Sequence, residues 1–400
     1  MEEWKEYKLG DIAIPIKDRI ETSILDKDSY ISTENMLPNK SGITTSSGVP
    51  SGSAVRFQEG DVLISNIRPY FKKIWRACFD GGSSADVICL RATNNIDPLF
   101  LYYLLSQDVF FDYVMQGAKG TKMPRGDKSQ IMQWPVLLPP INEQKQIAAL
   151  FKSLDDKIEV NRRINDNLEQ QAQALFKSWF VDFEPFKDGE FIESELGMIP
   201  KDWTVQPLGK LVTVIDNRGK TPPLCSDTIY PIIDVKSLSG LGRILNYDNC
   251  TKFVSHETYQ NWFRNGHPQY YDLLLSTVGS LAEIKMFTGG NGCIAQNVVA
   301  LRNRQMALFL FDYLNYIKPD LISYNIGSVQ PSIKVTHIIK HKILVPSNNI
   351  LNRYSDCCKT ITDLINCNCK IMRRLATLRD TLLPKLMSGE LKVNDIEKNL

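Results

Sequence analysis

The sequence lacks long hydrophobic runs and an apolar leader. Its apolar runs, such as Val136–Leu138 and Leu273–Leu275, are short, whereas a helix that crosses a bilayer needs about 18 such residues. The N-terminus, MEEWKEYKLG, is polar and carries no apolar segment of a signal peptide. We therefore expect a soluble protein located in the cytoplasm.

The number of cysteines is odd, and the first half of the chain contains no histidine. The chain has nine cysteines and four histidines, and all four histidines lie in its second half. A disulfide framework would favour an even number, so we expect reduced, partly buried thiols. The densest group is Cys357, Cys358, Cys367 and Cys369. On one helix, rising ~1.5 Å per residue, its two pairs lie about 15 Å apart, too far for one metal ion. We expect no metal site.

Signatures of catalysis are missing as well. Gly219-Lys220-Thr221 resembles the end of a phosphate-binding loop, but Val214 stands where that loop requires its first glycine. His256-Glu257 is followed by Gln260 instead of the second histidine of a zinc protease. The sequence therefore favours a binding protein that is not itself an enzyme and that binds no cofactor.

The overall composition indicates a globular protein of several domains. The 400 residues are 43% hydrophobic and 23% charged, close to average values for soluble proteins. At roughly 100–200 residues per domain, two to four folded units are expected. The net charge is only +2, but residues 200–351 carry 15 Lys and Arg against 10 Asp and Glu. Such a local excess of positive charge allows binding to a polyanion.

The two halves of the chain repeat each other. Short motifs return in the same order about 200 residues later, with small drifts in the offset. The matching pairs are Trp4 with Trp203, Leu9-Gly10 with Leu208-Gly209, Asp61–Ser65 with Asp272–Ser276, Asp86-Val87 with Asn297-Val298, Leu90-Arg91 with Leu301-Arg302, Leu99–Leu101 with Leu308–Leu310, Pro124 with Pro331, and Leu137–Pro139 with Leu344–Pro346. Two similar α+β domains in tandem are therefore predicted.

Each half consists of a globular part followed by a long helical part. Short β-branched and apolar runs bounded by turn residues predict strands in the globular parts, and apolar spacing predicts helices at Phe100–Tyr113 and Leu308–Tyr316. The predicted strands are Asp61–Ser65, Val87–Leu90, Ile232–Val235, Leu273–Thr277 and Val298–Leu301. The predicted segments are a first domain at 1–142, a long helix at 143–183, a linker at 184–199, a second domain at 200–351, a second long helix at 352–388 and a tail at 389–400.

The two long helices are predicted to pair as a coiled coil. No Gly or Pro occurs between Asn142 and Asp182, and a helix of about 38 residues would be roughly 57 Å long. Such a helix needs a partner for its apolar stripe. Asn161 and Asn368 occupy matching core positions, where they would fix the register or, alternatively, face solvent at the edge of the seam. Pro384 is expected to kink or end the second helix near Leu383. The predicted pairing residues are Leu154, Ile158, Asn161, Leu168 and Leu175 with Ile361, Ile365, Asn368, Leu375 and Leu382.

Basic loops in both globular parts are candidates for binding nucleic acid. Lys and Arg neutralise phosphates, glycine lets backbone N–H groups approach them, and Arg, Asn, Gln, Ser and Thr recognise base edges. Any one of these residues could equally lie in an ordinary solvated loop, but Lys122–Arg125 and Gln330–Ser332 fall at the same position of the repeat. The candidate residues are Arg68, Tyr70, Lys72, Lys73, Lys119, Thr121, Lys122, Arg125 and Lys128 in the first part, and Arg218, Lys220, Thr221, Ser328, Gln330, Ser332 and Lys334 in the second.

These motifs together resemble the specificity subunit of type I restriction-modification systems. The resemblance covers essentially the whole chain, and the order and duplication of the motifs are more specific than any one of them. The stretches that carry it are Trp4–Ala13, Leu138–Ile147, Phe176–Phe183, Glu195–Pro200 and Leu382–Glu390.

The resemblance implies a division of labour within a larger enzyme. Each globular part would be a target recognition domain for one half of a split, asymmetric site in double-stranded DNA. The long helices would pack antiparallel about a pseudo-two-fold axis, set the gap between the half-sites and, with Glu143 and Gln144, dock two methyltransferase subunits. Restriction and translocation subunits would join them, and S-adenosylmethionine, ATP and Mg²⁺ would bind to these partners. At the second docking site, Asn352 and Arg353 replace the Glu-Gln pair, which leaves docking there to other residues.

Two other interpretations remain open from the sequence. The chain could be the specificity chain of a type IIB-like restriction enzyme, which shares the same motifs. It could also be a coiled-coil scaffold without DNA specificity, although a scaffold would not need basic loops at matching repeat positions.

Overall fold

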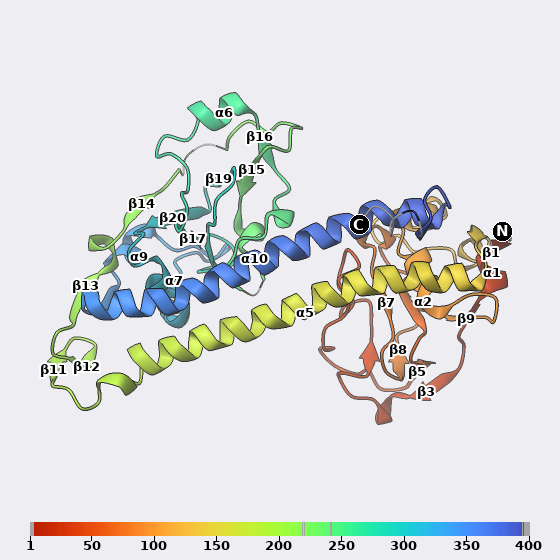
Figure 1. The fold of residues 1–400 in the computed structure, drawn as a ribbon, viewed down its shortest axis with the longest axis horizontal. Coiled ribbons are helices and arrows are strands. Elements are labelled where there is room, and N and C mark those ends of the chain that lie inside the picture. The colour runs from red at the N-terminus through yellow and green to blue at the C-terminus, as the bar shows by residue number, and fades with distance from the viewer. Residues whose placement is uncertain (1–3, 218, 220, 241, 394, 396–400) are drawn as a thin grey trace. The chain divides into compact units, whose positions relative to one another are not determined.

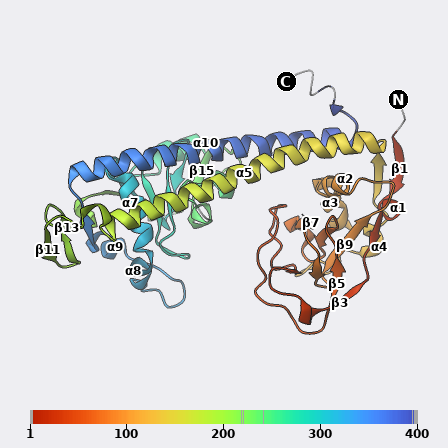
Figure 2. The same cartoon turned by 60° about the horizontal axis from the view of Figure 1, so that its bottom comes forward.

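A computed structural model describes residues 4–217, 219, 221–240, 242–393 and 395 of the chain (Figures 1 and 2). It divides into two compact units. The first combines residues 1–158 with residues 374–400, and the second comprises residues 159–373. Each unit therefore contains one predicted recognition domain together with a segment of both long helices.

The first unit holds two four-stranded sheets, one two-stranded sheet and four short helices of its own. Its strands are β1 (Lys5–Lys8), β2 (Ala13–Pro15), β3 (Arg19–Glu21), β4 (Tyr30–Ile31), β5 (Ser53–Phe57), β6 (Val62–Ser65), β7 (Ile74–Arg76), β8 (Gly81–Ser83), β9 (Val87–Ala92) and β10 (Pro135–Leu138). Its own helices are α1 (Leu9–Ile12), α2 (Pro98–Leu105), α3 (Asp108–Gln116) and α4 (Lys128–Ile131).

The second unit repeats this plan with an additional hairpin at its start. Its strands are β11 (Phe191–Ser194), β12 (Gly197–Pro200), β13 (Thr204–Pro207), β14 (Thr213–Ile215), β15 (Tyr230–Ile233), β16 (Phe253–Val254), β17 (Leu273–Ser276), β18 (Ile284–Met286), β19 (Cys293–Ile294), β20 (Val298–Arg302) and β21 (Lys342–Val345). Its own helices are α6 (His256–Asn261), α7 (Ala307–Tyr316), α8 (Lys318–Ser323) and α9 (Val335–Lys340). The hairpin β11–β12 occupies most of the predicted linker.

The sheets confirm the internal repeat. The first unit has the strand order β2-β9-β6-β7 and the second β14-β20-β17-β18, with the same antiparallel pairings. The antiparallel pair β1–β10 corresponds to β13–β21, and the parallel pair β4–β8 to β15–β19. The central strands β6 and β17 are buried on both faces, which explains their nearly continuous apolar sequences. All five predicted strands are present, with ends that differ by at most two residues.

An ion pair with a buried carboxylate recurs at the same place in both sheets. Asp61 accepts hydrogen bonds from the Arg91 guanidinium at 2.7 and 2.8 Å, and Asp272 is paired with Arg302 at 2.7 Å. Each carboxylate is buried and also caps the turn that precedes its strand, accepting from the backbone N–H of Gln58 or Gln269 at 2.8 Å. The matching sequence motifs therefore form the same ion pair and the same turn cap in both domains.

The long helices are α5 (Ile141–Phe180) and α10 (Asn348–Met387). They begin two and four residues before the predicted bounds, and they contribute to both cores. In the first unit, Phe151 of α5 and Leu386 of α10 pack with Phe100 of α2. In the second unit, Phe180 of α5 and Tyr354 of α10 pack with Phe309 of α7. Burial against the globular parts adds to any stabilisation that the helices gain from each other.

Within the second unit, the segments of α5 and α10 lie side by side and run in opposite directions (Figures 1 and 2). Asn165 accepts a hydrogen bond from Asn368 Nδ2 at 2.8 Å, whereas the Phe180 ring lies 4.9 Å from that of Tyr354. Asn161 is 3% exposed, so it does not face solvent. Its Nδ2 has no hydrogen-bond partner among the residues described.

The predicted pairing residues are buried or half-buried on the two helices. Asn161 and Ile365 are buried, and the other eight are partly exposed. Residues of both helices outside this set remain on the surface, for example Val160 and Ile164 on α5 and Leu364 and Leu378 on α10.

Two helix predictions need correction. The segment Phe100–Tyr113 is not one helix, because α2 ends at Leu105 and α3 starts at Asp108. The Ser106 hydroxyl donates to the Tyr102 carbonyl at 2.7 Å, and the backbone of Gln107 is extended. Pro384 does not end α10 near Leu383, since the helix continues to Met387. One missing N–H so close to a helix end removes a single hydrogen bond, and burial of Leu386 and Met387 holds the last turn.

In the described part of the chain, no helix is both long and apolar enough to cross a membrane. None of the nine cysteines is paired in a disulfide in this structure. Burial raises the pKa of the Cys293 and Cys358 thiols to about 12.

Candidate nucleic-acid interface

Two pairs of loops have the same backbone connections in the two domains. We call residues 66–73 and 119–128 the first loop pair, and residues 277–280 and 325–334 the second loop pair. In the first pair, Arg68 N donates to the Pro124 carbonyl at 2.8 Å and Gly126 N to the Asn66 carbonyl at 3.1 Å. In the second pair, the N–H of Gly279 donates to the carbonyl of Pro331 at 2.9 Å and that of Ile333 to the carbonyl of Thr277 at 2.8 Å.

The neighbouring strand supports both loop pairs in the same way. Asn66 N donates to the Asp86 carbonyl, and Thr277 N donates to the Asn297 carbonyl, both at 2.9 Å. Asp86 and Asn297 were matched in the sequence repeat. The first loop of each pair is therefore fixed to the start of the neighbouring strand, β9 or β20, and the two domains present corresponding loops on one common framework.

The first loop pair brings several of the predicted cations together. Lys119 and Arg125 exchange backbone hydrogen bonds at 2.9 Å, and Lys122 lies on the exposed turn between them. Arg125 pairs with Asp86 at 3.3 Å, and Lys119 with Asp127 at 3.2 Å. Because the Lys119 and Arg125 side chains are largely exposed and those of Asp86 and Asp127 are only half-buried, these pairs are weak and can be exchanged for phosphate contacts.

The remaining predicted residues of this loop pair surround that turn. Thr121 is exposed beside Lys122, and Lys128 begins α4, where its ammonium lies 3.5 Å from the Ala85 carbonyl. Arg68 is half-buried with left-handed backbone torsions (φ 50°), and its Nε has no hydrogen-bond partner among the residues described. Tyr70 is exposed, and its ring lies 4.6 Å from that of Phe71. Aromatic and cationic groups thus lie at the surface of the same domain.

Lys72 and Lys73 are engaged inside the domain. Lys72 and Lys40 both pair with Asp108, at 2.9 and 2.8 Å. Burial alone would raise the pKa of Asp108, but the hydrogen bonds from the two lysines outweigh it, so the pKa lies below its usual value. Lys73 donates to the Thr33 carbonyl at 2.6 Å, and burial, followed by repulsion from Arg68, lowers its pKa. These two lysines therefore hold loops together in this structure.

The second loop pair presents a largely uncharged tip. Ser328 and Gln330 are exposed, and Val329 between them is 97% exposed. The Asn325 side chain shapes this turn, because its Oδ1 accepts from Gly327 N at 3.0 Å and Ser332 N at 2.9 Å. Lys334 is exposed at the start of α9. Hydrogen-bonding side chains with few charges differ chemically from the cationic tip of the first pair, so the two domains cannot make identical contacts.

The third predicted loop is described only in part. Arg218 and Lys220 lie outside the described residues. Thr221 is exposed and accepts a hydrogen bond from Gln296 Nε2 at 3.2 Å. Since Gln296 precedes Asn297, which supports the second loop pair, Thr221 lies near that pair.

A polar hollow in the second unit was missed by the sequence analysis. It has a volume of about 640 Å³ and is lined by Asp216, Asn217, Gly219, Asn261, Trp262, Arg264 and Asn265. The Asn217 side chain stabilises the wall of the hollow. Its Nδ2 donates to the Gly266 carbonyl at 2.9 Å, and its Oδ1 accepts from Asn265 N at 3.0 Å. Trp262 is 37% exposed, and Arg264 is exposed. An aromatic ring, a guanidinium and several amides in one hollow are suited to contacts with bases and phosphates.

This hollow lies where the two domains differ. In the first unit β3 and β5 extend the second sheet beyond β8, whereas in the second unit β16 pairs with β15, the counterpart of β4, and α6 follows β16. The only signal in the sequence was the closely spaced Trp262, Arg264 and Asn265, which follow a helix too short to recognise by periodicity.

Gln144, predicted to dock a partner, is buried in its own domain. Its side chain is 2% exposed. Its Oε1 accepts from Asp97 N at 2.9 Å, and its Nε2 donates to the Pro139 carbonyl at 2.9 Å. Asp97 in turn caps the N-terminus of α2, so Gln144 connects the start of α5 with the start of α2. Glu143 is half-buried, and its docking role stays a prediction. No group of three or more potential metal ligands occurs in the described part of the chain.

Comparisons with known proteins agree with the two-domain architecture. The chain matches the type I restriction modification DNA specificity domain twice, over residues 1–170 and 200–371. The type I restriction enzyme MjaIX specificity subunit of Methanocaldococcus jannaschii is 28% identical, over 74% of this chain and 70% of that protein. The HindI specificity subunit of Haemophilus influenzae is 24% identical, over 98% of this chain and the full length of that protein.

A solved structure has a similar fold. The S subunit of a type I restriction-modification system from M. genitalium aligns over 96% of both chains with a TM-score of 0.54 and 16% sequence identity. The two matched domains occupy most of the present chain. The chain therefore belongs to the type I restriction-modification DNA specificity family, and it carries the domain of that family twice.

Proposed function

We propose that this chain selects the DNA target of a type I restriction-modification enzyme, with each recognition domain contacting one half of a split, asymmetric site. The observation that carries this proposal is the presence of two loop pairs with the same backbone connections and different side chains. A shared framework supports two domains placed for the same task, and different tips support different half-site sequences.

In this proposal, DNA contacts in the first domain come from the cationic turn of the first loop pair. Lys119, Lys122 and Arg125 approach phosphates, and Arg68 and Tyr70 lie beside them. In the second domain, Ser328 and Gln330 supply hydrogen bonds to base edges, with Thr221 and the hollow around Trp262 and Arg264 as further contacts. Lys72 and Lys73 keep their roles within the first domain and act on DNA only indirectly.

The two long helices are proposed to form an antiparallel coiled coil that sets the gap between the half-sites. The hydrogen bond between Asn165 and Asn368 within the second unit supports this arrangement, as does the burial of Asn161 and Ile365. The exposed apolar residues Val160 and Leu364 are suitable for contact with a partner.

The partners in this proposal are two methyltransferase subunits and the restriction and translocation subunits. S-adenosylmethionine, ATP and Mg²⁺ would bind to those subunits, and this chain would contribute no catalytic residue. Glu143 at the start of α5 remains a candidate for docking. A type IIB-like enzyme would use the same specificity chain with a different arrangement of partners.

Methylation mapping tests the proposal. The chain would be expressed with its cognate methyltransferase in a host without other adenine methylation, and methyladenine would be located by single-molecule sequencing. We expect one split, asymmetric motif with methyladenine on both strands. If the assembled complex were demonstrated and no such motif appeared, the scaffold interpretation would replace this one.

A further inference from the structure

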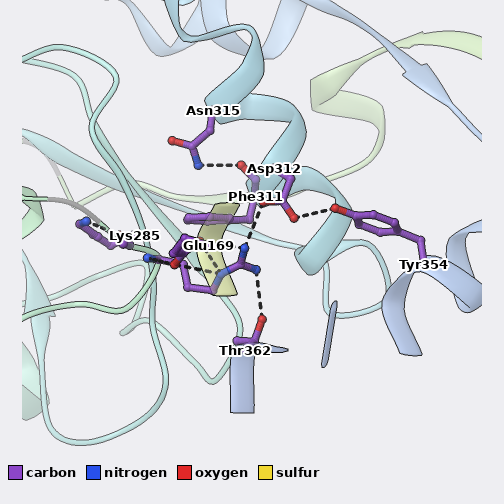
Figure 3. A network of polar contacts seen from close by, with 9 residues as sticks. Glu169, Lys285, Phe311, Asp312, Asn315, Tyr354 and Thr362 are labelled. Atoms are coloured by element: carbon purple, nitrogen blue, oxygen red, sulfur yellow. Dashed lines mark hydrogen bonds and ion pairs between the residues drawn. The ribbon is translucent and has the colours of Figure 1, made fainter. Parts of the chain in front are cut away.

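Arg243 joins the second recognition domain to both long helices. Its side chain is fully buried. The guanidinium donates to Glu169 of α5 at 3.0–3.2 Å and to Thr362 of α10 at 3.1 Å. It also contacts Asp312 of α7 at 3.3 Å (Figure 3). One side chain from a loop of the globular domain therefore bonds to three helices.

The surroundings of Arg243 are fixed by further contacts. Asp312 also accepts a hydrogen bond from the Tyr354 hydroxyl at 2.8 Å, and the Phe311 ring lies 4.9 Å from the guanidinium carbon (Figure 3). The backbone N–H of Arg243 donates to Glu169 at 2.7 Å. Burial alone would lower the pKa of Arg243, but the carboxylates of Asp312 and Glu169 outweigh it and hold the pKa above its usual value.

The loop that carries Arg243 is also hydrogen-bonded to the four-stranded sheet. The buried ammonium of Lys285 donates to the Gly240 carbonyl at 2.6 Å and also to the carbonyl of Gly242. Lys285 belongs to β18, at the edge of the four-stranded sheet. The sheet, the loop and the helices are thus connected through one continuous set of polar contacts.

The first unit has a smaller polar connection at the matching place. The Tyr103 hydroxyl of α2 donates to Asp155 of α5 at 2.8 Å, and Arg379 of α10 pairs with Asp155 at 2.7 Å. By the offsets of the sequence repeat, Tyr103 corresponds to Asp312 and Asp155 to Thr362. The arginine of the first unit comes from a long helix, whereas that of the second comes from the recognition domain itself.

Buried charge networks constrain geometry more than they stabilise a fold. Removing charges from water costs much of what their attraction returns, so an apolar replacement of similar volume is often equally stable. A displaced arrangement, however, would leave buried charges unpaired, which is strongly unfavourable. Rotation or sliding of the second recognition domain against α5 and α10 is therefore opposed by Arg243 and its partners, in addition to the apolar packing of Phe180 and Tyr354 on Phe309.

We propose that Arg243 is a positioning residue that fixes the second recognition domain on the long helices and thereby determines the length of the DNA gap that the enzyme accepts. This inference rests on the proposed function, since a gap exists only if the chain recognises a split site. It adds a specificity role for a residue that does not contact DNA.

The test measures gap tolerance separately from half-site sequence. The assembled methyltransferase complex would be given DNA targets with both half-sites intact and gaps altered by one or two base pairs. The main variant, Arg243→Met with Glu169→Leu and Asp312→Leu, replaces the charges by apolar side chains and is expected to fold. Arg243→Lys keeps the charge but loses the planar, multidentate geometry.

We expect the apolar variant to lose gap selectivity while it keeps half-site selectivity. The preference for the native gap should fall by about fivefold or more, while discrimination against altered half-site bases changes by less than about twofold, because the loop tips are untouched. Arg243→Lys should reduce the preference for the native gap by an intermediate amount. If the apolar variant does not fold, the gap preference of Arg243→Lys tests the proposal instead.

A matched control uses another arginine that joins the same domain and helix. Arg373 of α10 pairs with Asp248 at 3.3 Å, but both side chains are largely exposed, so Arg373→Met should leave the gap preference unchanged. The proposal is overturned if the folded Arg243 variants methylate only targets with the native gap, as the unaltered chain does. If the unaltered chain itself selects no split target, the proposed function fails instead.

Discussion

At the scale of single residues, the repeated ion pair is the clearest case of one structural device used twice. Asp61 and Asp272 are both buried, and each caps a turn and neutralises an arginine. Because Arg91 and Arg302 keep partial access to water, the pairs avoid part of the desolvation cost of fully buried ions.

Loss of either carboxylate should destabilise the unit to which it belongs. We predict that Asp272→Ala lowers the free energy of unfolding by about 2–3 kcal/mol, somewhat less than for a fully buried pair because Arg302 reaches solvent. Asp61→Ala should have a similar effect on the first unit. Urea denaturation followed by tryptophan fluorescence measures both changes, and a loss below about 1 kcal/mol in each variant would contradict this role.

His267 predicts a pH dependence of stability. Its ring stacks on Tyr259 at 3.7 Å, its Nε2 lies 2.8 Å from the Tyr259 carbonyl, and its Nδ1 is buried without a partner among the residues described. Burial lowers the pKa of His267. The folded state thus binds its proton less readily than the unfolded state, so stability is full above pH ~6.5 and falls as the pH decreases through the lowered pKa.

The measurement compares unfolding at pH 7.5 and pH 5.5. His267→Gln should reduce the loss of stability between these two values, whereas His256→Gln, which alters an exposed histidine, should not. An unchanged pH dependence in the His267 variant would mean that other groups cause it.

At the scale of elements, the structure shows why some features were predictable and others were not. The strands at β6 and β17 were predictable because both are short, buried and apolar. The break between α2 and α3 was not, because Ser106 and Gln107 occur readily inside helices. The bonds of Lys73 to Thr33 and of Gln144 to Asp97 join residues 40 and 47 positions apart. No local sequence pattern reveals such bonds. The sequence therefore indicated the candidate residues, but it did not distinguish exposed side chains from side chains that form hydrogen bonds within the domain.

Asn161 tests how polar groups act within the helix pair. Its amide nitrogen is buried without a partner in the described structure, which costs about 1–3 kcal/mol. Asn161→Leu should therefore raise the free energy of unfolding by about 1 kcal/mol, whereas Asn368→Leu removes the bond to Asn165 and should lower it. Thermal unfolding of the two variants should shift in opposite directions, and equal shifts would contradict the distinction.

The hollow beside α6 should act only on the half-site of the second domain. We predict that Trp262→Ala combined with Arg264→Ala weakens methylation of the target by about tenfold and relaxes base preference in one half-site. The first half-site should keep its sequence, because the first loop pair is unchanged. A methylation motif altered in both halves, or in neither, would exclude this hollow as a specificity element.

At the scale of the whole molecule, duplication explains most of what the sequence revealed. Two copies of one framework made the strands, the long helices and the corresponding loops recognisable from their matching order. The differences between the copies carry the specificity in our account, and they arise in β3 and β5, in α6 and at the loop tips, where the two sequences have diverged. The role of Arg243 could not be predicted, because its partners lie 69, 74 and 119 residues away.

The central claim is that each domain specifies one half of the target independently. The most direct test replaces residues 1–142 by the corresponding domain of a relative with a known half-site and maps methyladenine in the host genome. Our account predicts that one half of the motif changes to that of the relative while the other half stays the same. A motif that changed in both halves, or that did not change at all in an assembled complex, would contradict it.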